Sequence, residues 1–315
     1  MKTNINSNSG ALSRALFTAI LTAVAMALLI VPASVRAQTF YVTANDVGGS
    51  PNGYVDKVSN TGVVSLFATL PTGSDPYGLA FDGSSNLYVT SAATGQISKI
   101  TPGGAVSLFA TLPAGSGSAG LAFDGSGNLY AADQSTNKIS KITSGGAVSL
   151  FATLPGGSLP FGLAFDGSGN LYASDYGTNQ ISLITSGGSV SVFANVPFPS
   201  GLAFDSNGNL YAADNFASEI NKITPGGVVS HFATLPFNSN VLGLAFDNNG
   251  NLYAADNNTS QISEISPDGL TVSTFATGVS LPRFIALNPT PEPGSAMLAL
   301  AGGLSLLARR RRASA

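Results

Sequence analysis

One short segment occurs five times in this chain, and its spacing constrains the fold more than any other feature. Copies of Gly-Leu-Ala-Phe begin at residues 78, 120, 162, 201 and 243, and a weaker copy, Phe-Ile-Ala-Leu, occupies 284–287. A second segment, Leu-Tyr-Ala-Ala or a close variant, begins at residues 87, 129, 171, 210 and 252, and Phe-Tyr-Val-Thr at 40–43 precedes them all. The chain therefore holds six copies of each segment. They are offset, because the first unit lacks the first segment and the last unit lacks the second.

Each unit of about 42 residues contains four short runs rich in β-favouring residues. In one unit these runs are 120–123, 128–132, 138–143 and 147–154, and turn residues separate them. This pattern predicts an all-β fold, a six-bladed β-propeller of four-stranded antiparallel blades over residues 38–288. The offset further predicts that the first blade takes three strands from 40–70 and its fourth from 284–287. Pairing of the N- and C-terminal strands would then close the ring and protect its sheet edges.

The unit "GLAFDGSGNLYAADQSTNKISKI" resembles an NHL repeat, and more loosely the gluconolactonase-type propellers, over residues 40–287. The gluconolactonase-type resemblance implies a metal held at the central channel by a Glu, an Asn and an Asp. This sequence departs from that pattern. Its only glutamates between residues 38 and 288, Glu219 and Glu264, fall in the third strands, away from the expected axis.

The two ends of the chain are expected to be sorting signals that flank the propeller with two hydrophobic helices. Lys2 and Arg14 precede an uncharged apolar run from 15 to 31, and Val35-Arg36-Ala37 then offers small residues for signal peptidase. We therefore predict a signal peptide at 1–37 with cleavage after Ala37. The alternative is an uncleaved anchor, for which 17 residues is at the short limit.

The C-terminal segment 289–315 has three parts in a fixed order. Pro291-Glu292-Pro293 precedes 15 uncharged residues, 294–308, and the cluster Arg309, Arg310, Arg311 and Arg312 follows at once. This order resembles the PEP-CTERM sorting signal of Gram-negative bacteria. The resemblance implies a short transmembrane helix as a temporary anchor, removal of the tail by an exosortase, and delivery to the cell surface or extracellular matrix. The alternative is a plain single-span anchor.

Charge and the absence of cysteine limit the possible partners. Between residues 38 and 290 there are six basic residues against 15 acidic ones, a net charge of −9. An acidic body repels a phosphate backbone, so no nucleic-acid partner is expected. Without cysteine the chain has neither disulfides nor thiolate metal sites.

Histidine and the repeated aspartates are the first candidates for chemistry. The only histidine, His231, stands in a fourth strand where other units have Leu, Val or Thr, so we expect it at the outer surface without a catalytic role. One aspartate set begins the turns after Gly-Leu-Ala-Phe and is assigned to turn structure: Asp82, Asp124, Asp166, Asp205 and Asp247. A second set ends the Leu-Tyr-Ala-Ala strands on one face of the ring: Asp133, Asp175, Asp214 and Asp256. Four carboxylates around one mouth are suited to Ca²⁺, and the alternative, which we favour, is that each caps a local loop.

The loops that enter the Gly-Leu-Ala-Phe strands differ from unit to unit, as binding loops on a rigid scaffold do. They carry the residues of a possible ligand face: Tyr77, Phe161, Phe198, Phe237 and Arg283. Their aromatic rings are suited to stacking on sugars or peptides, and the alternative is local packing. Because no acid, base or metal ligand is recognised on an inner strand, we expect no cofactor and a secreted, non-catalytic binding protein associated with exopolysaccharide or a surface protein. The alternative is a propeller hydrolase or lyase of the gluconolactonase or streptogramin-cleaving type.

Overall fold

The computed structural model divides the chain into two units, Met1–Arg36 and Ala37–Ala315. It describes residues 38–45 and 52–288, all of which belong to the second unit. The predicted signal peptide, the sorting tail and the hydrophobic helices expected in both lie outside these described residues. Within them, no helix has the length and apolar character that crossing a membrane requires.

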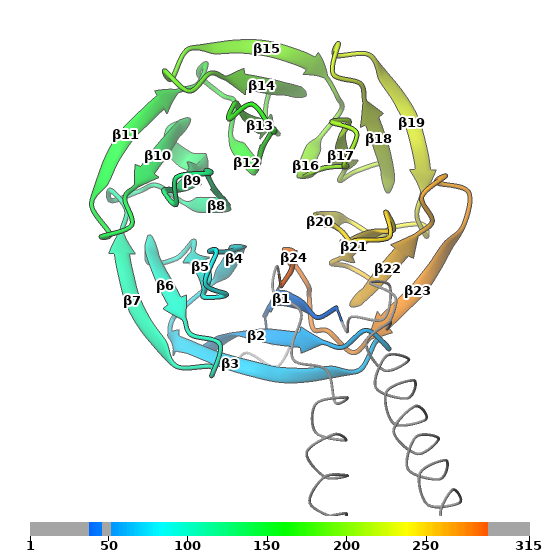
Figure 1. Ribbon diagram of the computed structural model, residues 1–315, viewed down its shortest axis with the longest axis horizontal. Coiled ribbons are helices and arrows are strands. Elements are labelled where there is room, and N and C mark those ends of the chain that lie inside the picture. Colours follow the sequence, from blue (N-terminus) through cyan, green and yellow to red (C-terminus); the bar gives the residue numbers. More distant parts are fainter. Residues whose placement is uncertain (1–37, 46–51, 289–315) are drawn as a thin grey trace, which may run out of the picture. The chain divides into compact units, whose positions relative to one another are not determined.

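The described residues form six four-stranded antiparallel sheets arranged in a ring, as the repeat predicts (Figure 1). From the innermost strand outward, the first blade holds β24 (Ile285–Leu287), β1 (Phe40–Ala44), β2 (Asn52–Val58) and β3 (Val64–Thr72). The next two blades hold β4 (Pro76–Phe81), β5 (Leu87–Ser91), β6 (Gln96–Ile100) and β7 (Val106–Thr111), then β8 (Ser118–Phe123), β9 (Leu129–Asp133), β10 (Lys138–Ile142) and β11 (Val148–Thr153). A 3-10 turn, η2 (Gln134–Thr136), follows β9.

The remaining three blades repeat the same order of strands. They hold β12 (Pro160–Phe165), β13 (Leu171–Asp175), β14 (Gln180–Ile184) and β15 (Val190–Asn195), then β16 (Pro199–Phe204), β17 (Leu210–Asp214), β18 (Glu219–Ile223) and β19 (Val229–Thr234), and finally β20 (Val241–Phe246), β21 (Leu252–Asp256), β22 (Gln261–Ile265) and β23 (Val272–Thr277). The innermost strands β4, β8, β12, β16, β20 and β24 surround the centre in Figure 1.

The ring closes where the offset of the repeat predicts. β1 pairs antiparallel with β24, with Phe40 opposite Leu287 and Val42 opposite Ile285. Two backbone hydrogen bonds extend this ladder: the Thr43 amide donates to the Phe284 carbonyl at 3.0 Å, and the Arg283 amide donates to the Thr43 carbonyl at 3.0 Å. Segments about 240 residues apart in sequence thus complete one sheet.

A tyrosine between two phenylalanines joins each blade to the next. Tyr130 of β9 makes edge contacts with Phe151 of its own blade and with Phe165 of the following inner strand, at centroid distances of 4.8 and 5.0 Å. The last interface has no such inner-strand phenylalanine, because β24 ends in Leu287. Phe40 of β1 takes its place and lies 4.2 Å from the Tyr253 ring. The aromatic residue of the repeat therefore fills the interface between blades.

The glycine of each Gly-Leu-Ala-Phe segment is required by the close approach of neighbouring inner strands. A Cβ atom built on Gly201 would lie 2.7 Å from the carbonyl oxygen of Leu242 in the next blade. Any side chain at this position would push the two backbones apart. The glycines of the repeat therefore set the diameter of the inner ring.

The first aspartate set has the turn role that the sequence predicts. Asp124 Oδ1 accepts hydrogen bonds from the amides of Ser126 and Asn128 at 2.9 and 2.8 Å, and its Oδ2 accepts from the Tyr130 hydroxyl. The same two amide contacts recur at Asp82, Asp166, Asp205 and Asp247. These bonds hold the pKa of Asp124 below its usual value although its partial burial acts in the opposite direction.

Candidate functional site

A cavity of about 300 Å³ lies on the face of the ring where the chain enters the inner strands. Two equivalent positions of the repeat supply most of its lining. The first is the residue before the inner-strand glycine position: Tyr77, Phe161, Ser200, Leu242 and Arg283. The second is the residue after the second strand: Gln134, Tyr176, Asn215 and Asn257. Asn240 and Leu281, from the loops just before the inner strands, complete the lining.

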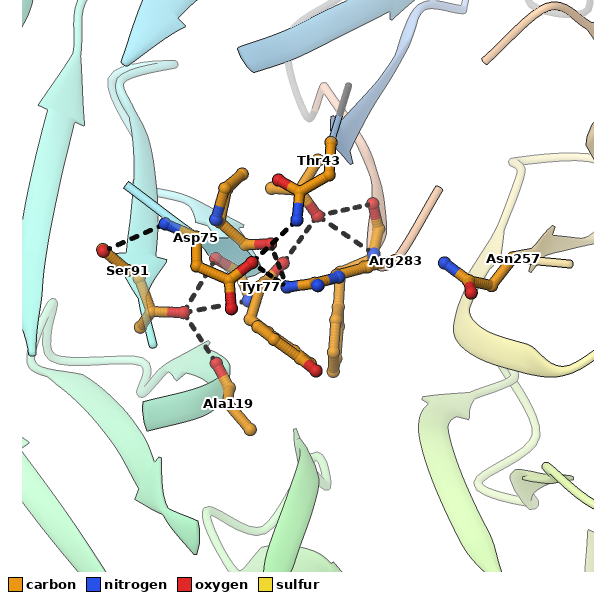
Figure 2. Close-up of polar contacts among 12 residues, drawn as sticks. Thr43, Asp75, Tyr77, Ser91, Ala119, Asn257 and Arg283 are labelled. Carbon is orange, nitrogen blue, oxygen red and sulfur yellow. Dashed lines mark hydrogen bonds and ion pairs between the residues drawn. The ribbon is translucent and has the colours of Figure 1, made fainter. Parts of the chain in front are cut away.

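Arg283 is the charged residue of this cavity. Its Nη1 lies 2.6 Å from Asp75 Oδ1 and donates to the Pro76 carbonyl at 3.2 Å, so it connects the last loop to the blade of β4 (Figure 2). Its guanidinium also lies 3.9 Å from the centroid of the Tyr77 ring. A cation over an aromatic face is attracted by the ring quadrupole. These contacts hold one positive charge and one tyrosine side by side at the mouth.

Further contacts fix the backbone around this pair. The Thr43 hydroxyl donates to the Tyr77 carbonyl at 2.6 Å across the blade interface, and Asn45 Nδ2 donates to Asp75 Oδ1 at 2.7 Å. The Tyr77 ring meets Phe161 edge-on at 5.9 Å, and Phe161 stacks on Phe284 at 5.4 Å. The tyrosine is therefore supported by the strands that close the ring.

A second group of aromatic residues extends outward from the cavity, and we call it the aromatic ridge: Tyr176, Phe198 and Phe216. The Phe198 ring lies 6.0 Å from Tyr176 and 5.4 Å from Phe216. Phe216 is 81% exposed and Phe198 is 38% exposed. Large apolar rings that remain in water beside a cavity are typical of a binding surface.

The backbone at the edge of the cavity is strained in three blades. The residue just before the first inner-strand position has a positive φ in five blades: +54° at Gly117, +49° at Leu159, +38° at Phe198, +51° at Asn240 and +43° at Leu281. Gly and Asn adopt this left-handed conformation readily, whereas Leu and Phe do so at a cost of about 1–3 kcal/mol each. Such strain concentrates at functional sites. Here Leu281 lines the cavity and Phe198 belongs to the aromatic ridge.

Side-chain amides line the other side of the cavity. Asn215 Nδ2 donates to Asn240 Oδ1 at 2.5 Å, Asn240 Nδ2 donates to Asn258 Oδ1 at 3.3 Å, and Asn257 Nδ2 donates to the Pro282 carbonyl at 3.1 Å. Asn257 lies across from Arg283 in Figure 2, and both residues line the cavity. The mouth thus offers amide donors and acceptors opposite a cation.

The second aspartate set lies beneath this surface, one residue in each of four blades. The Ser140 and Ser182 hydroxyls donate to Oδ2 of Asp133 and Asp175 at 2.6 Å, and Ser263 makes the same contact with Asp256. Oδ1 of these three aspartates is buried and finds no hydrogen-bond partner among the described residues. Burial raises the pKa of Asp133 and Asp175 to about 6 and that of Asp256 to about 7.

Asp214 differs from the other three, because Asn221 stands in its blade where they have a serine. Its Oδ1 accepts hydrogen bonds from the Phe216 and Ala217 amides at 3.0 and 2.9 Å, which is the loop-capping role that the sequence suggests. The four carboxylates are not brought together. Among residues 38–45 and 52–288, no three His, Cys, Asp or Glu side chains form a group suited to a metal ion. Calcium binding by this set stays an untested prediction.

Only some residues of the predicted ligand face line the cavity. Tyr77, Phe161 and Arg283 line the cavity, and Phe198 lies on the adjoining ridge. Phe237 is 97% exposed and does not line it. His231 lies in the outer strand β19, where Nε2 contacts the Thr234 hydroxyl at 2.9 Å, so its predicted surface position is confirmed. Tyr176, Phe216 and the asparagines of the cavity were not among the predicted residues.

A closed six-bladed propeller with a polar and aromatic cavity at one mouth is a scaffold shared by binding proteins and enzymes. The chain belongs to the virginiamycin B lyase family, whose model matches residues 55–290. No curated protein matches this sequence.

Solved structures share the fold at low identity. A catalytically inactive histidine-to-alanine variant of virginiamycin B lyase from Staphylococcus aureus, with quinupristin, is 22% identical over 78% of this chain and 78% of that one, with a TM-score of 0.58. The nidogen/laminin complex contains a similar chain, 18% identical over 79% of this chain and 98% of that one, with a TM-score of 0.66. A structure described as a putative gluconolactonase is 17% identical over 69% of this chain and 79% of that one, with a TM-score of 0.54.

The family corrects the expected function. The sequence analysis favoured a non-catalytic binding or matrix protein, because no inner strand supplies an obvious acid, base or metal ligand. The family match supports the alternative, a propeller lyase or hydrolase, and the binding interpretation is wrong. The physical reason for the error is that the polar groups of the cavity are tyrosines, an arginine and amides at the mouth ends of the inner strands and in the adjoining loops, and not the histidine or carboxylate expected of an acid, base or metal ligand.

Proposed function

We propose that this protein is a lyase whose substrate occupies the mouth cavity beside Arg283 and Tyr77. The strongest support is that one cavity is lined by an arginine, two tyrosines and several side-chain amides. The chain that forms this cavity belongs to a lyase family. Sites of this kind, concave and partly apolar with a few polar groups, are where propeller-type scaffolds bind substrates.

A lyase that removes a proton next to a carbonyl or carboxyl group needs two functions from its site. A base takes the proton, and a cation or hydrogen-bond donors stabilise the negative charge that develops on the oxygen. Arg283 and the amides of Asn215 and Asn257 can serve the second function. The titratable side chains that line the cavity besides Arg283 are Tyr77 and Tyr176, so we assign the proton transfer to these hydroxyls.

This chemistry differs from that of the Staphylococcus aureus lyase, which loses activity when a histidine is replaced by alanine. The single histidine here, His231, is exposed on the outer strand β19, far along the blade from the inner strands that border the mouth (Figure 1). We therefore expect His231 to be dispensable.

The purified full-length chain should convert virginiamycin B or quinupristin to products whose summed mass equals that of the substrate. Elimination leaves the total mass unchanged, whereas hydrolysis adds one water, so mass spectrometry distinguishes a lyase from a hydrolase. Tyr77→Phe or Tyr176→Phe removes only a hydroxyl group, and the variant that loses the base should show a kcat lower by about a hundredfold or more.

His231→Ala is the matched control for the tyrosine variants and should retain the wild-type rate. Products heavier by one water would replace the lyase proposal with a hydrolase. The lyase proposal would be contradicted if the chain turned over neither virginiamycin B, nor quinupristin, nor an acidic oligosaccharide.

We also propose that the chain is exported by the signal at 1–37, processed by signal peptidase after Ala37, and sorted through the 289–315 tail. Pro291-Glu292-Pro293, the apolar segment and the four arginines support recognition by an exosortase and only transient membrane anchoring. The destination would be the cell surface or extracellular matrix of a Gram-negative bacterium.

Intact-mass measurement of the protein recovered from the native host tests both processing steps. We expect a form that begins at Gln38 and lacks the tetra-arginine end. Recovery of Arg309–Arg312 in the mature protein would contradict removal of the tail.

A further inference from the structure

We propose that the substrate at the mouth is an acidic sugar, a uronic-acid unit of an oligosaccharide. This inference rests on the lyase function proposed above and adds the chemical class of the substrate. Charge, hydrogen-bonding groups and aromatic surfaces of the cavity each point to the same class.

The charge of the cavity favours an anion. Arg283 is the charged residue in its lining, although the propeller body as a whole is acidic. Its partner Asp75 contacts Nη1 at 2.6 Å and does not line the cavity, and the Arg283 side chain remains 17% exposed. A planar guanidinium is suited to a carboxylate, which it can bind through two parallel hydrogen bonds.

The remaining polar groups match hydroxyls. Gln134, Asn215, Asn240 and Asn257 each carry an amide with both donors and an acceptor, and Ser200 adds a hydroxyl. A sugar hydroxyl also donates and accepts, so each amide can satisfy it in either direction. Some of these amide groups already bond to one another or to the Pro282 carbonyl. A ligand with many hydroxyls and one carboxylate can bond to the donors and acceptors that remain, whereas an apolar ligand would cover those remaining groups at a cost.

The aromatic ridge provides ring surfaces on which sugar units can stack. The face of an aromatic ring is negative, and it attracts the partly positive C–H groups on the flat side of a pyranose ring. Tyr176, Phe198 and Phe216 form a continuous series that leads away from the cavity, with centroid spacings of 6.0 and 5.4 Å. This geometry suits further sugar units of a chain whose acidic unit lies at Arg283.

Elimination from such a unit needs no co-reactant. Arg283 and an asparagine amide hold the carboxylate on C5, and an ionised tyrosine oxygen takes the C5 proton. The electron pair of the C–H bond forms the C4=C5 double bond, the C4–O4 bond breaks, and O4 leaves with the bonding pair. The same tyrosine then gives the proton that it took from C5 to O4 and returns to its ionised form. The products are one fragment with a new reducing end, which keeps O4, and one fragment with an unsaturated uronate at its non-reducing end, with no water consumed. Because Tyr77 lies against the Arg283 guanidinium, it is the better-placed base.

The full-length chain should be tested with oligogalacturonate and oligomannuronate, with maltohexaose as the neutral control. We expect new ultraviolet absorbance from the conjugated double bond with either or both acidic probes, and none with maltohexaose. Calorimetry with the same probes measures binding independently of turnover.

Asn257→Asp tests recognition of the carboxylate without changing Arg283, whose contacts also close the ring. A carboxylate facing the Arg283 side of the opening should raise KM for the acidic probe by about tenfold or more through like-charge repulsion. Asn195→Asp, which makes the same charge change on the outer strand β15, is the matched control and should leave KM unchanged. Equal KM values for both variants would contradict the assigned carboxylate site.

The outcomes separate the two proposals. Turnover of virginiamycin B alone, with no binding of either uronate, would overturn the acidic-sugar substrate and leave the lyase function. Binding of a uronate without turnover of any compound would overturn the lyase function and leave the ligand class. Neither binding nor turnover would overturn both.

Discussion

A chain that ends at Pro282 will not form a stable closed propeller. This deletion removes β24, so β1 loses the strand with which it pairs through Phe40, Tyr41 and Val42. It also removes Phe284 and Ile285, which are 9% and 5% exposed and pack between the first and last blades. Burial of two such side chains contributes about 3–6 kcal/mol, a large part of the 5–15 kcal/mol that stabilises an ordinary domain. We expect loss of the cooperative thermal transition, measured by circular dichroism, and increased binding of a hydrophobic dye.

A chain that ends at Thr290 is the control, since it keeps every described residue. It should unfold at the same temperature as the full-length chain. A milder variant, Ile285→Ala, should lower the free energy of unfolding by about 2–4 kcal/mol while the transition stays cooperative. Equal stability of the chains ending at Pro282 and Thr290 would show that pairing of β1 with β24 does not hold the ring together.

The propeller could be predicted because its constraints are repeated in the sequence. Each copy of Gly-Leu-Ala-Phe carries a glycine that the neighbouring inner strand requires, as Gly201 shows, and an aromatic residue that fills the interface between blades. The offset between the two segments then indicated that residues 284–287 complete the first blade. A single blade gives no such signal, and the prediction depended on comparing six of them.

One detail of closure was not predictable from the repeat. At the last interface Leu287 stands where the other inner strands have phenylalanine, and Phe40 fills the space from the neighbouring strand β1. The sequence shows that the phenylalanine is absent from its usual position, but which side chain replaces it depends on packing between segments about 240 residues apart. Tertiary contacts of this kind are not encoded in local periodicity.

The candidate site was predicted only in part. Tyr77, Phe161 and Arg283 were predicted because they lie in segments that vary between units, although the structure places Tyr77 and Phe161 at the beginnings of β4 and β12. Tyr176, Asn215 and Asn257 follow directly after the repeated aspartates, and they were not predicted because their residue types differ from one another and form no recognised motif. A signal was present: this position varies among Gln134, Tyr176, Asn215 and Asn257 although the five residues before it hardly change. A variable position inside a constant repeat is therefore as informative as a variable loop.

The aspartates themselves show how the same residue type acquires different roles. Asp214 caps a loop, as its sequence position suggests, whereas Asp133, Asp175 and Asp256 each accept from a serine one strand away. The difference depends on the paired strand, where Asn221 replaces Ser140, Ser182 or Ser263. Register between strands decides which partner each carboxylate meets, and it is not visible from the aspartate and its chain neighbours alone.

The buried aspartates will make the propeller less stable as the pH rises from about 4 to about 7. Burial disfavours their charged form, so the folded-state pKa of Asp256 is raised from 3.8 to about 7 and those of Asp133 and Asp175 to about 6. A raised folded-state pKa contributes stability that is fully present below the unfolded-state value and is lost as the pH passes through the folded-state value. Urea unfolding of the full-length chain at several pH values should show this decrease as a lower midpoint at pH 7 than at pH 5.

Asp256→Asn keeps the shape of the side chain and removes the ionisation. It should raise the free energy of unfolding above pH 7 by about 2–4 kcal/mol, and by much less near pH 3, where Asp256 is mostly neutral in both the folded and the unfolded chain. Asp124→Asn provides the opposite case, because hydrogen bonds hold the pKa of Asp124 below its usual value. That carboxylate stabilises the fold above its unfolded-state pKa, so the variant should be destabilised at pH 7, and the difference should shrink as the pH falls. If Asp256→Asn instead destabilised the protein at pH 8, the carboxylate would have to be held in its charged form by a cation, which would revive the calcium site predicted for this aspartate set.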